Sequence, residues 1–396
     1  ISYIKPTFAS GQTAVSPAST GGTFTLTGEN LGTSATAQLS VRNPFTGTFS
    51  TVSVPVTAQS HTSVTVSIPA GVGTGHRLIV NAGGQVTESP ISVNYQSPAV
   101  SGTAPPTGTT TGAVLTVGGS NFGVDAALLR VTVGSFNCTV LSLLSPSALT
   151  CRMPEGEGAN LPVRVQAADQ QSEVTTTSFS YLAPNVSTIT PTESRTSGGV
   201  VVSVRGSNFG RRGNVSLSAI VASLSFTSNT PEVERQPVQV PTENLHFWSH
   251  TFMNFTMPAA QGIRRQLIVS AGEQQSIQGV YFMFAPPNVT SMTPAAGNTD
   301  GGFVTTISGS SLGTQGARVE IGGRSCPVVS QQHDTITCTV PSGVGADLDV
   351  QVYVGDRAAN TIKFSYDPPV ITMLVPNVPD ARGEEVVVRG RNFGQE

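Results

Sequence analysis

Charge is scarce in this sequence, and lysine is nearly absent. Charged residues make up 11% of the 396 residues, the formal net charge is −3, and the lysines are Lys5 and Lys363. Basic residues gather into nothing longer than a pair such as Arg211–Arg212. Because a protein that binds DNA or RNA is expected to carry a basic patch or stripe, we expect no nucleic acid among the partners.

Long hydrophobic runs are missing as well. No apolar stretch reaches the roughly 18 residues with which a helix crosses a bilayer, so we expect no membrane insertion within this segment. The pattern of a signal peptide is also absent, and the chain opens on Ile1 instead of Met. We therefore expect these residues to be an internal piece of a longer polypeptide.

Glycine and proline, by contrast, are plentiful, with 42 and 27 residues beside many Ser, Thr and Val. These residue types are weak helix formers, whereas Val and Thr favour strands and Gly and Pro favour turns. The composition predicts many short strands joined by tight turns. A chain of this length exceeds what one core supports, so we expect several domains.

One motif is written five times along the chain, at spacings of about 80 to 100 residues. Its copies are "TFTLTGENLG", "VLTVGGSNFG", "VVSVRGSNFG", "VTTISGSSLG" and "EVVVRGRNFG". Apolar residues alternate with small or polar ones before the Gly-rich end, which predicts a half-buried strand that ends in a turn. Each of the four complete repeats continues with an x-x-Pro element: "VSIP", "CRMP", "FTMP" and "CTVP". Units of this size, all strand and turn, predict small β-sandwiches.

The order of these elements resembles the IPT/TIG family, which occurs in plexins and related receptors, fibrocystin-like surface proteins, bacterial surface proteins and Rel-type transcription factors. The resemblance covers four copies and a fragment. It is strongest at residues 287–367, where "TDGGFVTTISGSSLG", "VEIGGRSCPVV" and "ITCTVPSGVG" follow in the family's order. The resemblance implies an all-β fold of tandem immunoglobulin-like β-sandwiches arranged as beads on a string, and it implies no single activity.

The repeats divide the chain into four sandwiches and the start of a fifth. We predict sandwiches at residues 1–97, 98–183, 184–286 and 287–367, and a truncated fifth repeat at 368–396. The third sandwich is expected to carry an insertion at residues 217–252. Short Pro-containing junctions between the repeats favour a fairly stiff connection.

Four cysteines, Cys138, Cys151, Cys326 and Cys338, fall as one pair in repeat two and one pair in repeat four. Three connectivities are open to four cysteines, and pairing within each repeat is favoured because each pair lies on neighbouring predicted strands. Alignment on the x-x-Pro element places Val66 and Phe255 where Cys151 and Cys338 stand, and Val54 where Cys326 stands. A valine pair in place of a cysteine pair favours two structural disulfides over zinc, which needs more thiolates. Disulfides in turn favour a location outside the cytosol.

The Gly-rich end of the motif invites a catalytic interpretation in repeat four, where Gly309 to Gly313 match the G-x-S-x-G nucleophile elbow. The other copies carry Asn in place of Ser311, and no helix is predicted to follow. The loop also lacks the lysine and the helix of a phosphate cradle. We therefore expect no catalysis and no cofactor: the Gly and Asn residues bend the backbone, the Asn side chain bonds its own turn, and the adjacent Leu or Phe plugs the end of the sandwich.

The least repetitive feature is an aromatic cluster in repeat three, for which a core position and a partner contact are both open. The candidate contact residues are His246, Phe247, Trp248 and Phe252. His246 and His250 share one face of a strand, but without a third ligand no metal site is expected. Calcium is disfavoured because the junctions lack clustered carboxylates.

Five N-x-S/T sequons are candidate glycosylation sites in an exported protein: Asn137, Asn185, Asn214, Asn254 and Asn288. Asn185 and Asn288 stand at the same place in two repeats, just after a junction. These two are the foremost candidates.

Together these features predict a non-enzymatic extracellular or cell-surface segment, a structural or adhesive rod or fibre within a larger glycoprotein of the secretory pathway. Its partners would be proteins or further copies of itself. The alternative is a ligand-binding receptor ectodomain of plexin type. A Rel-type DNA-binding module is disfavoured by the charge, the cysteines and the sequons. A spacer in an exported carbohydrate-active enzyme is a further alternative.

Overall fold

The computed structural model describes residues 4–87, 90–174, 176–211, 215–221, 237–262, 265–276, 280–375, 383 and 385–394. Strands dominate these residues, and the helical elements among them are two single 3-10 turns, η1 (Ala126–Leu128) and η2 (Thr242–Asn244). The chain divides into two compact units, one of residues 1–183 with 272–274 and one of residues 184–271 with 275–396. Each unit is described by itself.

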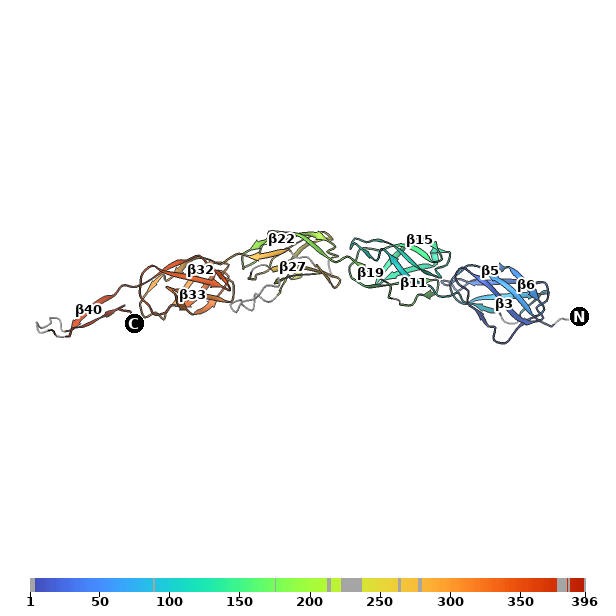
Figure 1. The fold of residues 1–396 in the computed structure, drawn as a ribbon, viewed down its shortest axis with the longest axis horizontal. Helices are drawn as coiled ribbons and strands as arrows, with labels where there is room; N and C mark the ends of the chain where they lie inside the picture. The colour runs from blue at the N-terminus through green and yellow to red at the C-terminus, as the bar shows by residue number, and fades with distance from the viewer. Residues whose placement is uncertain are drawn as a thin grey trace. The chain divides into compact units, whose positions relative to one another are not determined.

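In the first repeat, two sheets enclose a common core (Figure 1). One sheet has the order β1 (Thr7–Phe8), β3 (Gly22–Glu29), β7 (Ser63–Ile68), β6 (Val56–Ser60). The other has the order β2 (Ala14–Val15), β10 (Ile91–Val93), β8 (His76–Ala82), β4 (Ala35–Arg42), β5 (Phe49–Val54), with β9 (Gln85–Val86) beside β8. The β2–β10 pair is parallel, and the other pairs are antiparallel.

In the second repeat, one long strand joins the two sheets. The order is β11 (Ala99–Ala104), β13 (Val114–Ser120), β16 (Ala148–Arg152), β15 (Phe136–Ser145), β14 (Leu129–Val133), β17 (Leu161–Ala167), β19 (Ser178–Tyr181), β12 (Thr107–Gly108), with β18 (Gln170–Gln171) beside β17. The first residues of β15 pair with β14 up to Cys138, and the rest pair with β16 from Thr139 onward. The strand therefore belongs to both layers.

The second unit repeats the same plan twice. In the third repeat, one sheet has the order β20 (Asn185–Thr190), β22 (Val201–Ser207), β26 (Phe252–Thr256), β25 (Leu245–Trp248). The other has the order β21 (Glu193–Ser194), β29 (Tyr281–Phe284), β27 (Arg265–Ala271), β23 (Val215–Val221), β24 (Val238–Gln239), with β28 (Gln274–Gln275) beside β27. In the fourth repeat, one sheet has the order β30 (Asn288–Thr293), β32 (Val304–Ser310), β36 (Thr335–Thr339), β35 (Val328–Gln331). The other has the order β31 (Ala296–Gly297), β39 (Ile362–Tyr366), β37 (Leu348–Val354), β33 (Ala317–Ile321), β34 (Arg324–Cys326), with β38 (Arg357–Ala358) beside β37. The hairpin of β40 (Val370–Val375) and β41 (Val387–Arg391) follows.

Alternation along each strand explains the sandwiches. In β7, for example, Val64, Val66 and Ile68 are buried while the residues between them are half-buried, as period-two patterning requires. These side chains pack against Leu39 and Val80 of the facing sheet. The second, third and fourth repeats each have a core of the same kind. The expected fold class, all-β with tandem immunoglobulin-like sandwiches, is confirmed.

Much of the segment expected as an insertion, residues 217–252, belongs to the sheets themselves. Most of β23 together with β24 and β25 falls within it and pairs with regular strands of the third repeat. Residues 222–236, which lie between β23 and β24, fall outside the described residues. The lack of sequence likeness in this stretch therefore does not mark a lack of equivalent strands.

Candidate functional site

The first glycine of the repeated motif allows two strands to meet closely. A Cβ atom built on it would lie closer than 3.0 Å to a carbonyl oxygen of the opening strand of the same repeat, a distance that real Cβ atoms do not show. This holds in all five copies, at Gly28, Gly119, Gly206, Gly309 and Gly390. Because β3, β13, β22, β32 and β41 pair there with the opening strands, any side chain would push the strands apart.

The next positions of the motif turn the chain and close the core. The third residue has a left-handed backbone in each copy, with φ between 57° and 61°, at Asn30, Asn121, Asn208, Ser311 and Asn392. The fourth residue is fully buried in the four complete repeats, at Leu31, Phe122, Phe209 and Leu312. The architectural interpretation of the loop is therefore confirmed. After Ser311 the next element is the strand β33, so the described residues show no strand–turn–helix elbow there.

The expectation that the Asn side chain bonds its own turn does not hold for Asn121. Its Oδ1 accepts a hydrogen bond from the Ser19 N–H at 3.1 Å, and its Nδ2–H donates to the carbonyl of Ser97 at 3.2 Å. Ser19 belongs to the first repeat, so this side chain connects two repeats.

The last glycine of the motif contacts a side chain of the preceding repeat. This occurs at the three junctions whose two repeats belong to the same unit. A Cβ on this glycine would lie closer than 3.0 Å to the side chain of the residue three positions after the x-x-Pro proline. The docked pairs are Val72 on Gly123, Gln261 on Gly313 and Val344 on Gly394. Each of these glycines has a positive φ, between 68° and 83°. The recurring Gly is thus a socket for the neighbouring repeat, and we call these contacts the junction sockets.

A tyrosine holds the loops that carry the docking residues Val72 and Val344, and a third tyrosine holds the equivalent loop of repeat two. The hydroxyl of Tyr95 donates to the carbonyl of Pro69 at 2.8 Å, and its ring fills the space beside Gly71. Tyr181 and Tyr366 donate in the same way to Pro154 and Pro341. Burial raises the pKa of Tyr95 and of Tyr181 to about 12, so these hydroxyls remain donors at physiological pH.

In unit one, polar contacts surround the Val72 socket. Asp169 accepts hydrogen bonds from the N–H and the hydroxyl of Thr74, at 3.0 and 2.7 Å, and pairs with the guanidinium of Arg42 at 3.2 Å. Gln170 accepts from the N–H of Gly73 at 3.2 Å and donates to the carbonyl of Tyr95 at 2.7 Å. The turn between β17 and β18 therefore holds the loop that carries Val72 through hydrogen bonds.

In unit two, the docking residue itself supplies the polar contacts. Gln261 is 2% exposed, and its Oε1 accepts from the N–H of Thr314 at 2.8 Å while its Nε2–H donates to the carbonyl of Gln315 at 3.0 Å. The fully buried guanidinium of Arg265 donates twice to the Gln261 carbonyl, at 2.9 and 2.7 Å. Arg265 thus fixes the backbone of the loop at Gln261, and the side chain of Gln261 bonds the loop to the fourth repeat.

Three of the five histidines occupy one equivalent position. The carbonyls of His61, His250 and His333 accept the N–H of the buried fourth motif residue, at 3.0, 3.0 and 2.8 Å. Pro146 takes this place in repeat two. Each of these residues precedes the x-x-Pro proline by eight positions, a spacing that would have revealed the pattern in the sequence. Among the described residues no group of three or more His, Cys, Asp or Glu is placed to hold a metal ion.

The aromatic cluster of repeat three divides between core and surface. Trp248 is 9% exposed, packs in the core, and donates from Nε1 to the carbonyls of Phe209 and Gly210. Core burial and both hydrogen bonds favour the core position for Trp248, and the partner contact of the cluster stays a prediction. Phe247 is 51% exposed and lies beside Phe252, over which Arg205 is placed. The exposed His246 contacts the hydroxyl of Thr256 through Nε2.

The cysteines form Cys138–Cys151 and Cys326–Cys338, one bond within each of two repeats. Val54 and Val66 are buried at the equivalent place in repeat one. Repeat three fills it with Phe255 and with Val240, which the sequence analysis missed. A following proline marks this position in three repeats, as Val54-Pro55, Val240-Pro241 and Cys326-Pro327.

The sequons differ in exposure. Asn137, Asn185 and Asn288 are exposed, whereas Asn254 is half-buried on β26, between two neighbouring strands, and its Oδ1 is buried. Asn214 lies outside the described residues. Asn185 and Asn288 open the edge strands β20 and β30, whose outer sides pair with no strand of the described residues.

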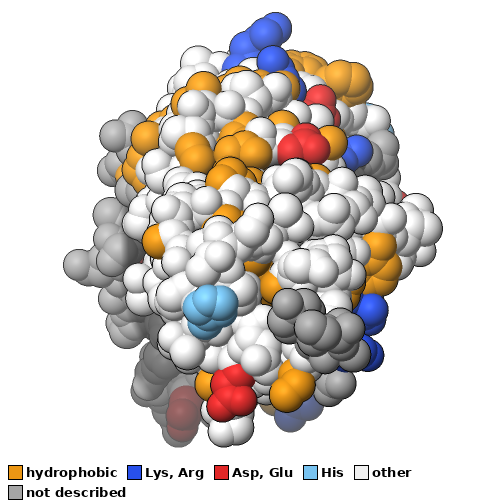
Figure 2. Space-filling model, turned by 90° about the vertical axis from the view of Figure 1, so that its right-hand side faces the viewer, with side chains coloured by type: hydrophobic (Ala, Val, Ile, Leu, Met, Phe, Trp, Pro, Cys, Tyr) orange, Lys and Arg blue, Asp and Glu red, His pale blue; other side chains and the backbone are white. Residues whose placement is uncertain are grey.

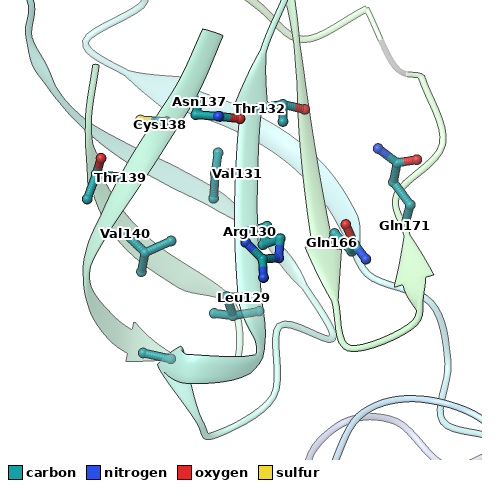
Figure 3. Close-up of a pocket in the computed structure, with 11 residues that line it drawn as sticks. Leu129, Arg130, Val131, Thr132, Asn137, Cys138, Thr139, Val140, Gln166 and Gln171 are labelled. Atoms are coloured by element: carbon teal, nitrogen blue, oxygen red, sulfur yellow. The ribbon is translucent and has the colours of Figure 1, made fainter. Parts of the chain in front are cut away.

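A hollow on the second repeat is lined by both polar and apolar residues. It has a volume of about 410 Å³, and β14, β15, β17 and β18 supply Arg130, Thr132, Asn137, Gln166 and Gln171 (Figure 3). Arg130 is the one charged residue in its lining. On the face shown in Figure 2, uncharged side chains predominate, and the Lys, Arg, Asp and Glu side chains are few. No helix among the described residues is both long and apolar enough to span a membrane.

Comparison with known proteins gives one matching family model, the IPT/TIG domain, at residues 98–181, 184–283 and 287–366, well over half of the chain. Fibrocystin-L of Homo sapiens is 25% identical over 301 residues, which cover 74% of this chain and 6% of that protein. Plexin-B1 of Homo sapiens is 25% identical over 281 residues, which cover 68% of this chain and 12% of that protein. The chain therefore spans a small part of the curated relatives it matches.

Among solved structures, the extracellular region of plexin A4, domains 1 to 10, is similar at 14% identity and a TM-score of 0.24, and the match covers 98% of this chain and 39% of that one. The matched family ranges leave out residues 1–97. The strand order β1-β3-β7-β6 of the first repeat nevertheless equals the order β30-β32-β36-β35 of the fourth.

Proposed function

Because the chain belongs to the IPT/TIG domain family, we propose that it is a non-enzymatic segment of an extracellular or cell-surface protein, in which tandem sandwiches hold one another in a set arrangement. The observation that carries this proposal is the junction socket, which recurs with Val72, Gln261 and Val344 as docking residues. A repeated contact of this kind restrains neighbouring repeats, whereas an enzyme would need convergent reactive groups.

Several features support a location outside the cytosol. Both disulfides fit an oxidising compartment. The exposed sequons at Asn137, Asn185 and Asn288 suit N-glycosylation in the secretory pathway. Fibrocystin-L and Plexin-B1 are among the similar curated proteins.

Two uses of such a segment remain in competition, a structural or adhesive rod or fibre and a ligand-binding receptor ectodomain. The sockets favour the structural use, because they occupy the ends of the repeats with contacts between neighbours. One observation favours a protein ligand. On the outer face of repeat three, Phe247 packs beside Phe252, and Arg205 lies over the Phe252 ring. Substituting Phe247 and measuring ligand capture would separate the two once a ligand is known.

Strand edges bear on how partners or further copies would attach. In the third and fourth repeats, both edge strands of the first sheet, β20 with β25 and β30 with β35, carry a register shift. Such bulges discourage edge-to-edge pairing. The edge strand β5 differs: it is uncharged and pairs with β4 over six residues without a shift. We propose β5 as the edge at which another strand adds.

A Thr51→Lys change in the middle of β5 tests this edge. We expect the charge to reduce self-association of the chain by about tenfold or more, because a lysine on an edge strand opposes strand addition. Sedimentation equilibrium of the native and variant chains measures it. Equal association of both chains would exclude β5 as the edge, and the matched change Thr57→Lys on β6 is expected to have no effect.

The socket itself is tested by Gly123→Ala. The new Cβ would collide with the Val72 side chain, so we expect the first and second repeats to separate. The readout is hydrogen exchange at the N–H groups of Gly73 and Thr74, which bond to the second repeat. Protection there should fall about tenfold or more.

Gly32→Ala is the matched control, because Gly32 ends the same motif with φ of 65° and its nearest outside atom, on Ala82, is 3.8 Å from the built Cβ. It imposes the same backbone strain, about 1 kcal/mol, without a collision. The double variant Val72→Ala with Gly123→Ala should regain most of the protection. Unchanged exchange in Gly123→Ala would refute the socket.

A further inference from the structure

His76, at the start of β8, is buried directly beneath the first junction. Its side chain is 3% exposed, and both ring nitrogens are engaged. Nδ1 accepts the backbone N–H of Arg42 at 2.9 Å, and Nε2 lies 3.0 Å from the carbonyl of Val72, to which Nε2–H donates. An imidazole that accepts at Nδ1 and donates at Nε2 is neutral.

The two backbone groups that His76 joins belong to the two residues that meet the second repeat. Val72 is the docking residue in the Gly123 socket. Arg42 pairs through its guanidinium with Asp169, which also accepts from Thr74. The His76 ring therefore bonds both to the residue of the apolar contact, Val72, and to a residue of the polar contact, Arg42.

The equivalent position in the other repeats is identified by strand register. His76 pairs with Val93, and the corresponding pairs are Leu161 with Phe179, Arg265 with Phe282 and Leu348 with Phe364. Arg265 performs the same task as His76, because it donates to the carbonyl of the docking residue Gln261. An arginine keeps its proton at every physiological pH, whereas a histidine does not.

We propose that His76 is a pH-sensitive latch of the first junction, closed when the ring is neutral and opened when it gains a second proton. The proposal rests on the proposed function, since it concerns regulation of the same sockets. Protonation places an N–H at Nδ1 directly against the N–H of Arg42, so that two donors face each other. The ring must then leave one or both partners, and the Val72 loop and Arg42 lose their common support.

The charged groups around the ring set the direction of the response. Burial lowers the pKa of His76 below the usual 6.5, and Arg42 acts in the same direction, while the bond to Val72 and the Asp169 charge oppose it. A lowered pKa in the folded state means that the contribution of the neutral ring is complete above about pH 6.5. It is lost as the pH falls below that value. Tyr95, in edge contact with the ring, stays uncharged throughout.

Hydrogen exchange on the full chain at pH 7.5 and pH 5.5, corrected for intrinsic rates, tests the latch. We expect protection at the N–H groups of Gly73 and Thr74 to fall about tenfold at the lower pH. The N–H of Thr314, bonded to Gln261 at the Arg265 junction, should keep its protection and serves as an internal control. In His76→Gln, whose amide both accepts and donates without titrating, protection should not change with pH.

The outcomes separate the latch from the sockets. If Gly73 and Thr74 are protected at both pH values, or if His76→Gln loses protection like the native chain, the latch is refuted while the socket stands. If they are unprotected already at pH 7.5, the docked junction itself is wrong. Asp169→Asn removes the carboxylate that accepts from Thr74, so protection should be weaker at both pH values and should still fall at the lower pH if His76 is the latch.

Discussion

Replacing Gly206 with alanine is expected to destabilise the third sandwich by about 3 kcal/mol, the upper range for an overpacked core. The added Cβ would lie closer than 3.0 Å to the carbonyl oxygen of Asn185, which is backbone and has no rotamer through which to escape. The strands β20 and β22 must therefore separate. Trp248 lies in this core and is the single tryptophan, so urea unfolding followed by its fluorescence reports on this repeat.

Gly199→Ala is the matched control in the same repeat. Gly199 has φ of 81° and no atom within 4 Å of its built Cβ, so alanine there adds backbone strain alone. That strain is about 1 kcal/mol. The two variants thus separate close approach from left-handed backbone. If Gly206→Ala were as stable as Gly199→Ala, the close approach of the opening strand would not be the reason for the first glycine.

Removing the disulfide of the fourth repeat should have the second large effect. Replacing Cys326 and Cys338 by serine is expected to cost about 3 kcal/mol from the loop of 12 residues, in the chain-entropy account. Two hydroxyls in a site where both sulfurs were buried add about 1 to 3 kcal/mol each when they find no partner. Hydrogen exchange of β36 under increasing urea measures the stability of this repeat.

The valine pair of the first repeat supplies the control. Val54 and Val66 fill the equivalent place without a disulfide. The double change Cys326→Val with Cys338→Val should therefore lose the chain-entropy contribution of the disulfide and little further stability. The valine variant is therefore expected to be more stable than the serine variant by about 2 kcal/mol or more. Equal stability of the two variants would show that the site is not an apolar core position.

The sequence alone predicted the fold because the relevant signals are local. Alternation before each motif determines which face of β3, β13, β22 and β32 is buried, and a left-handed turn needs Gly or Asn wherever it occurs. The buried Leu31 and Phe122 follow from the same pattern. Local signals also explain why the motif could be recognised as architecture without knowledge of its neighbours.

The sockets could not be predicted in this way, because they depend on a contact between repeats. Nothing in the spacing of Gly123 shows that Val72, some fifty residues earlier, would dock on it. Val240 was missed because the amino-acid sequence of the stretch before it is not similar to that of the other repeats. The shared position of His61, His250 and His333, in contrast, was visible as an eight-residue spacing before the proline and needed only the right alignment.

The most direct test of the sockets is the nuclear Overhauser effect between a docking side chain and its glycine. On the native chain with labelled valine methyl groups, we expect a cross-peak from Val72 to the Hα atoms of Gly123, and another from Val344 to those of Gly394. Absence of both cross-peaks, with the cores of the adjoining repeats intact, would contradict the claim that the motif's last glycine receives the preceding repeat.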